Sequence, residues 1–316
     1  MKKTLIAAGV AALMSSTAAI ADTSIGVSMA LFDDNFLTVL RNGMIETAEG
    51  MEGIDLQVED ARNDVARQLD QINNFIASGV DAIIVNPVDT SATEAMTAAA
   101  EAAGVPLVYV NRQPINVETL PDNQAFVASD ERESGTLQTI EQCRLWEEMG
   151  LESANIYIMM GELSNQAAVQ RTQDIFDVIE AGNCAVELNI LDQQTANWSR
   201  NEAQDLMTNW LSTGDPFDGL IANNDEMAIG AIQAMLASGI DMEAVVVGGI
   251  DATQDALAAM GAGQLDVTVF QDAAGQGGGA LEAAIALAAG EDVDQIVYIP
   301  FQLVTPLNIG DYTSRN

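Results

Sequence analysis

The chain has 316 residues, and its 11 lysine and arginine residues stand against 47 aspartate and glutamate residues, which gives a formal net charge of −36. Proteins that bind nucleic acid or anionic membranes need clustered basic residues, so this charge excludes both classes of partner. The chain also lacks histidine, which excludes a Ser-His-Asp hydrolase and a histidine-ligated zinc site.

The first 21 residues have the three-part pattern of a cleaved signal peptide. Lys2 and Lys3 precede an apolar run at residues 5–14, and residues 19–21 supply an A-x-A cleavage site before Asp22. The apolar run is shorter than the ~20 residues that a bilayer-spanning helix needs. We therefore expect a soluble mature chain that begins near Asp22, contains no lysine and resides in the bacterial periplasm.

Short runs rich in valine and isoleucine alternate with alanine-rich stretches of helical length, and 48% of the residues are hydrophobic, enough for a folded core. The predicted strands cover residues 25–31, 56–59, 82–85, 107–110, 126–128, 156–160, 186–191, 219–222, 245–248, 267–270 and 298–303. The predicted helices cover residues 35–49, 65–77, 93–103, 166–180, 201–211, 227–237, 253–260 and 279–289. This alternation predicts parallel sheets with helices on both faces.

The predicted strands are too many for one sheet of this kind, and the series restarts near Ala154 after a long helix that ends around Gly150. An internal similarity supports a division, because residues 75–87 and 214–224 both contain a buried strand that ends on asparagine. The sequence therefore predicts an α/β fold of two doubly wound parallel-sheet lobes.

Cys143 and Cys184 are the only cysteines. The oxidising periplasm permits a disulfide between them. Two unpaired buried thiols are the alternative, and a count of two cysteines does not decide between these states.

Ligands of open α/β sheets bind at the carboxyl ends of the strands, so the residues after each predicted strand form the candidate site. These residues are mainly hydrogen-bonding side chains and aromatic rings. They are Asp34, Phe36, Asn86, Asn111 and Arg112 in the first lobe, and Glu162, Arg171, Trp198, Asn224, Asp251 and Gln271 in the second. Arginine, carboxylate and amide groups bind hydroxyls, and aromatic faces cover the C–H faces of a ring. The set predicts a cleft between the lobes for a small ring with many hydroxyl groups.

Some of these side chains also have a structural interpretation. Asn86 suits a turn before Pro87. Arg112 and Arg171 could be ion-pair partners in so acidic a protein.

Other polar and aromatic residues near the strand ends also suit local roles. Asp89 and Asp225 suit helix N-caps, and Phe32 with Phe36 could form a staple at the entry to a helix. The glycine-rich residues 275–280 lack the first-strand position of a dinucleotide fingerprint, so we interpret them as a loop and helix start and expect no cofactor.

Five blocks of sequence, at residues 81–87, 105–112, 170–173, 222–231 and 245–253, resemble the sugar-binding periplasmic proteins of the ribose-binding type. Proteins of that family deliver a ligand to an ABC importer. The segments 28–43, 161–171 and 194–198 look most like the inositol and rhizopine binders of the family. Asp34 departs from the ribose-type pattern, where Asn is usual, and Asn111 stands where Asp is usual. The resemblance therefore favours a cyclitol, myo-inositol or an amino-inositol, over a pentose or hexose.

The resemblance also implies a role for each site residue. Phe36 and Trp198 would hold the ring between them. Hydroxyl groups would be bound by Asp34, Asn86 and Arg112 from the first lobe, and by Arg171, Asn224, Asp251 and Gln271 from the second lobe and hinge.

The family implies three crossings between the lobes, near Ser129, Asp272 and Gln302, and closure around the ligand by hinge motion. The lobes would be 22–129 with 272–302, and 130–271 with 303–316. We expect a monomeric receptor without catalysis, whose partners are the importer's permease and, as a further candidate, a chemoreceptor. An exported sugar-active enzyme that uses Asp34 and Asp251 as its carboxylate pair is the alternative.

Overall fold

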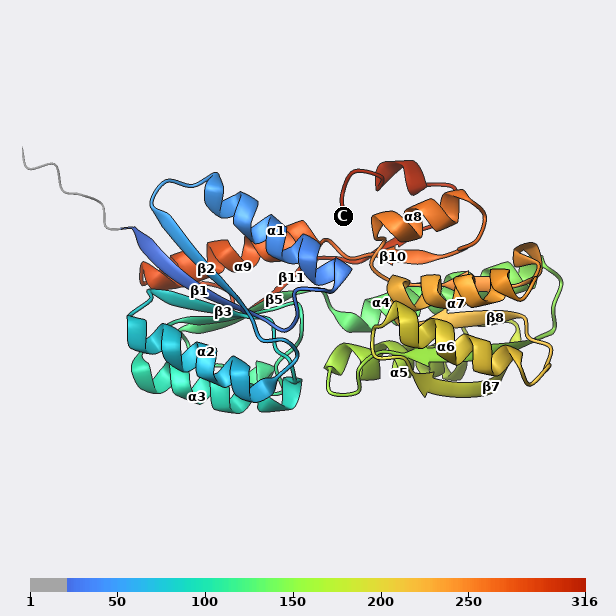
Figure 1. Cartoon of the computed structure of the whole chain (residues 1–316), viewed down its shortest axis with the longest axis horizontal. Coiled ribbons are helices and arrows are strands. Elements are labelled where there is room, and N and C mark those ends of the chain that lie inside the picture. The colour runs from blue at the N-terminus through green and yellow to red at the C-terminus, as the bar shows by residue number, and fades with distance from the viewer. Residues whose placement is uncertain (1–21) are drawn as a thin grey trace, which may run out of the picture.

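The computed structural model describes residues 22–316, so the predicted signal peptide lies outside the described residues. The molecule has two α/β halves side by side, which confirms the predicted fold class (Figure 1). We call the half that contains the chain's first strand the first lobe and the other half the second lobe. Within residues 22–316, no helix is both long and apolar enough to cross a membrane.

The first lobe has a six-stranded sheet in the order β11-β5-β4-β3-β1-β2, and every neighbouring pair is parallel. Its strands are β1 (Thr23–Met29), β2 (Ile54–Asp60), β3 (Ala82–Val85), β4 (Leu107–Val110), β5 (Gln124–Ala128) and β11 (Ile296–Tyr298). Its helices are α1 (Asn35–Glu49), α2 (Val65–Ser78), α3 (Thr93–Ala103) and α9 (Ala273–Ala288). Helices α1 and α9 cover one face of the sheet, and α2 and α3 cover the other (Figure 1).

The second lobe has a parallel sheet in the order β7-β6-β8-β9. Its strands are β6 (Ser153–Met160), β7 (Glu187–Thr195), β8 (Gly219–Ala222) and β9 (Val246–Gly248), and β10 (Thr268–Phe270) pairs antiparallel with β12 (Gln302–Val304). Its helices are α4 (Glu131–Glu148), α5 (Gln166–Glu180), α6 (Arg200–Leu211), α7 (Asp225–Ala237) and α8 (Gln254–Gly261). Short 3-10 helices lie at Thr90–Ala92, Val117–Thr119, Met242–Ala244 and Ile309–Asp311.

The chain passes between the two lobes three times. We call these passages connections: the first joins β5 to α4, the second joins β10 to α9, and the third joins β11 to β12. The residue-level boundaries of the lobes, expected near Ser129, Asp272 and Gln302, stay a prediction.

Two predicted elements differ from the structure at these connections. The predicted strand at 298–303 is in fact two strands, β11 and β12, separated by residues 299–301. Pro300 lies in this interval and has no backbone N–H to donate to a strand partner. The break therefore lies within a largely apolar run, residues 296–304, that crosses from one lobe to the other.

The glycine-rich residues 275–280 lie inside helix α9, which begins at Ala273, so a helix does lie here but the loop part of their interpretation is wrong. Helix α9 packs closely along α1. A Cβ atom on Gly277 would lie 2.5 Å from the carbonyl oxygen of Leu40, so the missing side chain lets the two backbones approach. The glycines serve helix packing, which overrides their poor helix propensity.

Cys143 on α4 and Cys184, just after α5, form a disulfide with a Cα–Cα distance of 5.3 Å. The bond closes a loop with a sequence separation of 41 residues and ties together two helices that cover one face of the second sheet.

Candidate ligand-binding cavity

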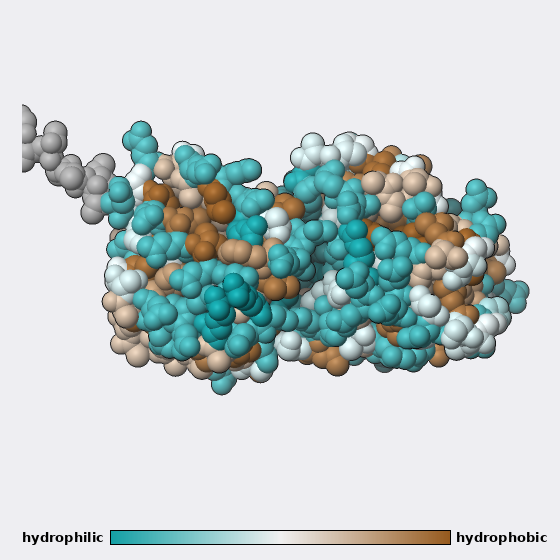
Figure 2. All heavy atoms as spheres, in the orientation of Figure 1, coloured by the Kyte–Doolittle hydropathy of each residue, from teal (hydrophilic) through white to brown (hydrophobic). Residues whose placement is uncertain are grey.

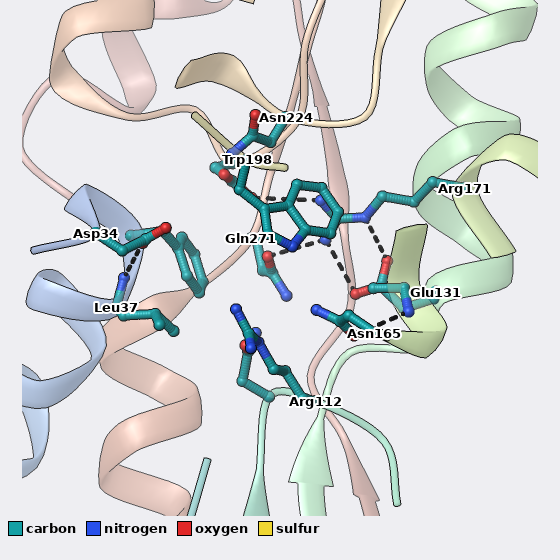
Figure 3. Close-up of a pocket in the computed structure, with 13 residues that line it drawn as sticks. Asp34, Leu37, Arg112, Glu131, Asn165, Arg171, Trp198, Asn224 and Gln271 are labelled. Carbon is teal, nitrogen blue, oxygen red and sulfur yellow. Dashed lines mark hydrogen bonds and ion pairs between the residues drawn. The ribbon is translucent and has the colours of Figure 1, made fainter. Parts of the chain in front are cut away.

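A cavity of about 390 Å³ lies between the lobes at the carboxyl ends of both sheets. Figure 2 shows a mainly hydrophilic surface on both halves and a hollow where they meet. The cavity is lined by Asp34, Phe36, Leu37, Asn111, Arg112, Glu131, Asn165, Ala167, Arg171, Trp198, Asn224, Asp251 and Gln271 (Figure 3). All the site residues proposed from the resemblance lie there except Asn86. We call this space the inner cavity.

Arg171 of α5 is buried beside the inner cavity and bound on several sides. Its Nε and Nη2 donate to the two carboxylate oxygens of Glu131 at 2.7 and 3.0 Å. Its Nη1 donates to the carbonyl oxygen of Asn223 at 2.7 Å, and Asp251 Oδ1 lies 3.8 Å from Nη1. Arg171 is therefore a structural ion-pair partner, the alternative role that its sequence context suggested, and it lines the cavity as well.

The contacts of Arg171 reach all three connections between the lobes. Glu131 is the first residue of α4 and directly follows the first connection. Gln271, in the second connection, accepts a hydrogen bond from Arg171 Nη2 at 3.3 Å. The ring of Phe301, in the third connection, lies 6.0 Å from the guanidinium carbon. A group that binds Arg171 therefore acts next to every segment that joins the lobes.

Arg112 follows β4 and enters the cavity from the first lobe (Figure 3). Its Nη1 donates to the carbonyl oxygens of Pro87 and Val88 at 3.1 and 3.3 Å. Burial lowers the pKa of Arg112, and the negative charges of Glu162 and Asp34 oppose that shift. The Glu162 carboxylate lies 3.8 Å from Nη1, which is beyond hydrogen-bond distance. The ion-pair role suggested for Arg112 is therefore a weak one.

Asn86 does not line the cavity, because its side chain is fully buried and occupied elsewhere. Its Nδ2 donates to the carbonyl oxygen of Val110 at 3.2 Å and to Oδ1 of Asn111 at 3.3 Å. Its Oδ1 accepts a bond from the Ala30 amide at 3.4 Å. These bonds join the end of β3 to the ends of the neighbouring strands, so the Asn86 side chain holds that of Asn111 in place. Asn86 therefore bonds to distant residues and does not have the local turn role that Pro87 suggested.

Asn111 has the left-handed backbone φ of +66°, which asparagine tolerates better than most residues. Its Nδ2 donates to Oε1 of Gln276 on α9 at 3.2 Å. The strand end at Asn111 is thus bonded to two other elements of the first lobe, which fixes the adjacent Arg112.

Two aspartate carboxylates line the cavity, Asp34 from the first lobe and Asp251 from the second. Asp34 caps α1 by accepting a bond from the Leu37 amide at 2.8 Å, and burial raises its pKa. Burial also raises the pKa of Asp251 well above its usual value, Arg171 opposes the shift, and the charge of Asp225 adds to it. Both carboxylates therefore gain from a ligand that donates hydrogen bonds or carries positive charge.

Asp225 does not cap α7 as predicted, because Asn224 holds that position and accepts a bond from the Met227 amide at 3.0 Å. The carboxylate of Asp225 is buried instead, where it accepts bonds from Thr268 Oγ1 at 2.7 Å and the Thr253 amide at 2.8 Å. Burial raises its pKa to about 7.

Two residues near the strand ends of the first lobe have local roles. The predicted N-cap at Asp89 is confirmed, since its side chain accepts a bond from the Ser91 amide at 2.8 Å. Phe32 lies under the guanidinium of Arg41, at 4.2 Å from its ring centre.

Two aromatic rings line the cavity from opposite lobes. Phe36 belongs to α1, and Trp198 belongs to the turn between β7 and α6. Trp198 has a φ of +62°, an unusual value for a bulky residue, which indicates strain at this turn. A Cβ atom on Gly161 would overlap the Trp198 ring, so only glycine at position 161 leaves room for that ring.

Buried donors in the cavity lack acceptors in the part of the chain that the structure describes. They are Nε1 of Trp198 and Nε2 of Gln271. Figure 3 shows both side chains, and that of Arg112, converging on the same space. Since an unsatisfied buried donor costs free energy, the site is suited to a ligand rich in acceptor oxygens.

Reasoning from strand ends missed two polar residues of the cavity, Glu131 and Asn165. Both stand at helix starts: Glu131 opens α4, and Asn165 caps α5 by accepting a bond from the Ala167 amide at 3.1 Å. Helix starts that follow strands belong to the same end of an α/β sheet. An Asn or Glu at such a start is the signal that would have located them.

The model of the periplasmic binding protein domain matches residues 25–292 of this chain. A Rhizobium meliloti protein named "Putative rhizopine-binding protein" is 59% identical over 316 residues, all of both chains. The ribose import binding protein of Bacillus subtilis is 30% identical over 89% of this chain and 87% of its own.

Among solved structures, an ABC transporter solute binding protein from Bacillus halodurans, with bound myo-inositol, superposes with a TM-score of 0.86. Its identity is 41%, over 94% of this chain and 99% of its own. The folds therefore agree along nearly their whole lengths. The chain belongs to the periplasmic binding protein family.

Proposed function

We propose that this protein is the solute-binding receptor of an ABC importer and that it binds a cyclic polyol, myo-inositol or an amino-inositol, in the inner cavity. Membership of the family implies a periplasmic location. The rhizopine-binding name of one relative and the myo-inositol bound in a solved neighbour support the ligand class. Export would follow cleavage before Asp22, which N-terminal sequencing of the periplasmic protein would test.

The observation that carries this proposal is the pairing of donors and acceptors from opposite lobes in one buried cavity. Arg112 and Arg171 supply fixed hydrogen-bond donors, and Asp34 and Asp251 supply acceptors. A polyol ring offers both kinds of partner at every carbon. The polar groups converge on one small space between the lobes, which suits a single ring.

The aromatic residues complete the polyol site. Phe36 and Trp198 line the cavity with apolar surface and can cover the C–H faces of a ring. We expect Phe36→Ala to weaken binding about tenfold or more while the protein still folds and unfolds in one cooperative transition, at a lower temperature because Phe36 is buried. Unchanged affinity in both Phe36→Ala and Trp198→Ala would contradict stacking.

Isothermal titration calorimetry tests the ligand class directly. We expect one site per chain, with myo-inositol or scyllo-inosamine binding more tightly than ribose and galactose. Nanomolar-to-micromolar binding of ribose with no binding of either cyclitol would contradict the proposal. The same receptor role for a pentose or hexose, which the ribose import relative supports, would then take its place.

A receptor releases its ligand unchanged, whereas an exported enzyme would convert it. Asp34 and Asp251 are the carboxylates that such an enzyme would use. Incubation of the bound polyol with the protein, followed by chromatography, should recover only the starting compound, and a product would favour the enzyme. The permease of the importer is the partner that a receptor requires. A monomeric state and a chemoreceptor contact belong to the same proposal.

A further inference from the structure

A second cavity opens beside the inner one. It is the larger of the two, with about 750 Å³ of space, including its opening to solvent. The two share Asp34, Arg112 and Trp198 as lining residues, so these three side chains form the boundary between them. We call the second space the outer cavity. The site proposed above for a single ring is the inner cavity and does not include this space.

The lobes already touch each other around the outer cavity. Asn35 Nδ2 donates to Glu226 Oε1 at 2.7 Å, and Asn63 Nδ2 donates to Glu162 Oε1 at 2.7 Å. Each bond joins the first lobe to the second, and all four residues line the outer cavity. Contact between the lobes therefore leaves this space open, and a ligand that extends into it is compatible with that contact.

The walls of the outer cavity carry the chemistry of a polyol site. Amide and hydroxyl side chains line it, among them Asn197, Ser199 and Asn201. Its charged groups are the carboxylates of Asp33, Asp34, Glu162 and Glu226 against the guanidinium groups of Arg112 and Arg200, so negative charge is in excess. A neutral polyhydroxylated group fits these walls, whereas an anionic group is repelled.

Arg112 at the boundary has donors to spare. The side chain is 7% exposed, and within residues 22–316 its guanidinium makes hydrogen bonds only from Nη1, to the carbonyl oxygens of Pro87 and Val88. Its Nε and Nη2 are therefore free for an acceptor at the junction of the two cavities. The bridging oxygen between two rings is such an acceptor.

We propose that the outer cavity is a second subsite and that the receptor takes two-ring ligands, in which a cyclitol in the inner cavity carries a neutral sugar ring in the outer one. This inference rests on the proposed function, because it places the cyclitol in the inner cavity. The space, the polar walls and the free donors of Arg112 at the junction support it together.

Calorimetry with galactinol, a galactosyl-myo-inositol, tests the subsite. We expect galactinol to bind within about tenfold of myo-inositol, and inositol 1-phosphate to bind far more weakly than either. Binding of myo-inositol without any binding of galactinol would overturn the subsite alone. Tight binding of inositol 1-phosphate would overturn the assigned preference for a neutral group. Absence of binding by all cyclitols would overturn the proposed function and the subsite with it.

A substitution on α6 locates the second ring. Asn201 is exposed and lines the outer cavity but not the inner one, so Asn201→Trp should fill the outer space. We expect galactinol to bind at least about tenfold more weakly and myo-inositol to bind within about twofold of the unsubstituted protein. Asn209→Trp, an exposed position on the same helix outside both cavities, is the matched control. Unchanged galactinol affinity in Asn201→Trp would overturn the placement.

Discussion

The ion pair between Glu131 and Arg171 is the interaction whose removal should reveal most about this site. Both side chains are at most 5% exposed, and two hydrogen bonds of 2.7 and 3.0 Å join them. Glu131→Gln preserves the size of the side chain but removes its charge. The Arg171 guanidinium would then be left with Asp251, at 3.8 Å, as its remaining carboxylate partner.

The expected magnitude follows from the burial of this pair. Loss of one partner of a buried ion pair costs about 3 to 5 kcal/mol, because it leaves a buried charge without compensation. Asp251 and the remaining amide oxygen of glutamine reduce that cost, so we expect a loss of about 3 kcal/mol in the free energy of unfolding. Ligand affinity should also fall about tenfold or more, because Arg171 moves from its position beside the cavity.

A matched control lies on the same helix. Glu141 pairs with Arg144 at 2.7 Å, but the Arg144 side chain is 44% exposed. Glu141→Gln should therefore cost about 1 kcal/mol or less and leave ligand affinity unchanged. Urea unfolding and calorimetry measure both effects. Equal stability losses in the two variants, with unchanged affinity in Glu131→Gln, would refute the role assigned to Glu131.

Three other predictions concern the aromatic wall, the disulfide and a buried carboxylate. Trp198→Ala should weaken ligand binding about tenfold or more in calorimetry, like Phe36→Ala, without changing the cooperativity of unfolding. Reduction of the Cys143–Cys184 bond, which closes a loop with a separation of 41 residues, should lower the free energy of unfolding by about 4 kcal/mol in urea titrations with and without reductant. Burial raises the pKa of Asp225 to about 7, so between about pH 4 and pH 7 the folded state holds a proton that the unfolded chain has released. The free energy of unfolding of the ligand-free protein should therefore fall as the pH rises from 5 to 7, by up to about 1.4 kcal/mol per unit, and Asp225→Asn should remove that part of the slope. A stability that rises across this interval to the same extent in both proteins would contradict the assignment.

The strand ends were predictable because two local signals agree. The β-branched runs mark buried strands, and the carboxyl ends of parallel strands converge on one edge of each sheet. Arg112 and Asp251 could therefore be placed in one cleft from a single sequence. The same reasoning placed Asn86 in the cleft, because position along a strand does not show which partners a side chain will find in neighbouring strands.

The remaining errors arise from contacts between segments that are distant in sequence. Gly277 lies in helix α9, where the absence of a side chain lets the backbone of α9 approach that of α1. The residues around Gly277 in the sequence do not show that α1 packs there. Asp225 is buried against Thr253 and Thr268, so Asn224, one residue earlier, became the cap. Glu131 was not predicted as a site residue, because its partner Arg171 lies 40 residues away in the sequence. Only the position of Glu131 at a helix start could have indicated it.

A crystal structure of the protein with myo-inositol is the most direct test of the central claim that one polyol ring is bound between the lobes. We predict a ring between Phe36 and Trp198, with hydroxyl oxygens within hydrogen-bond distance of Arg112 from the first lobe and Arg171 from the second. A ligand that contacts one lobe only, or that lies outside the inner cavity, would contradict the account.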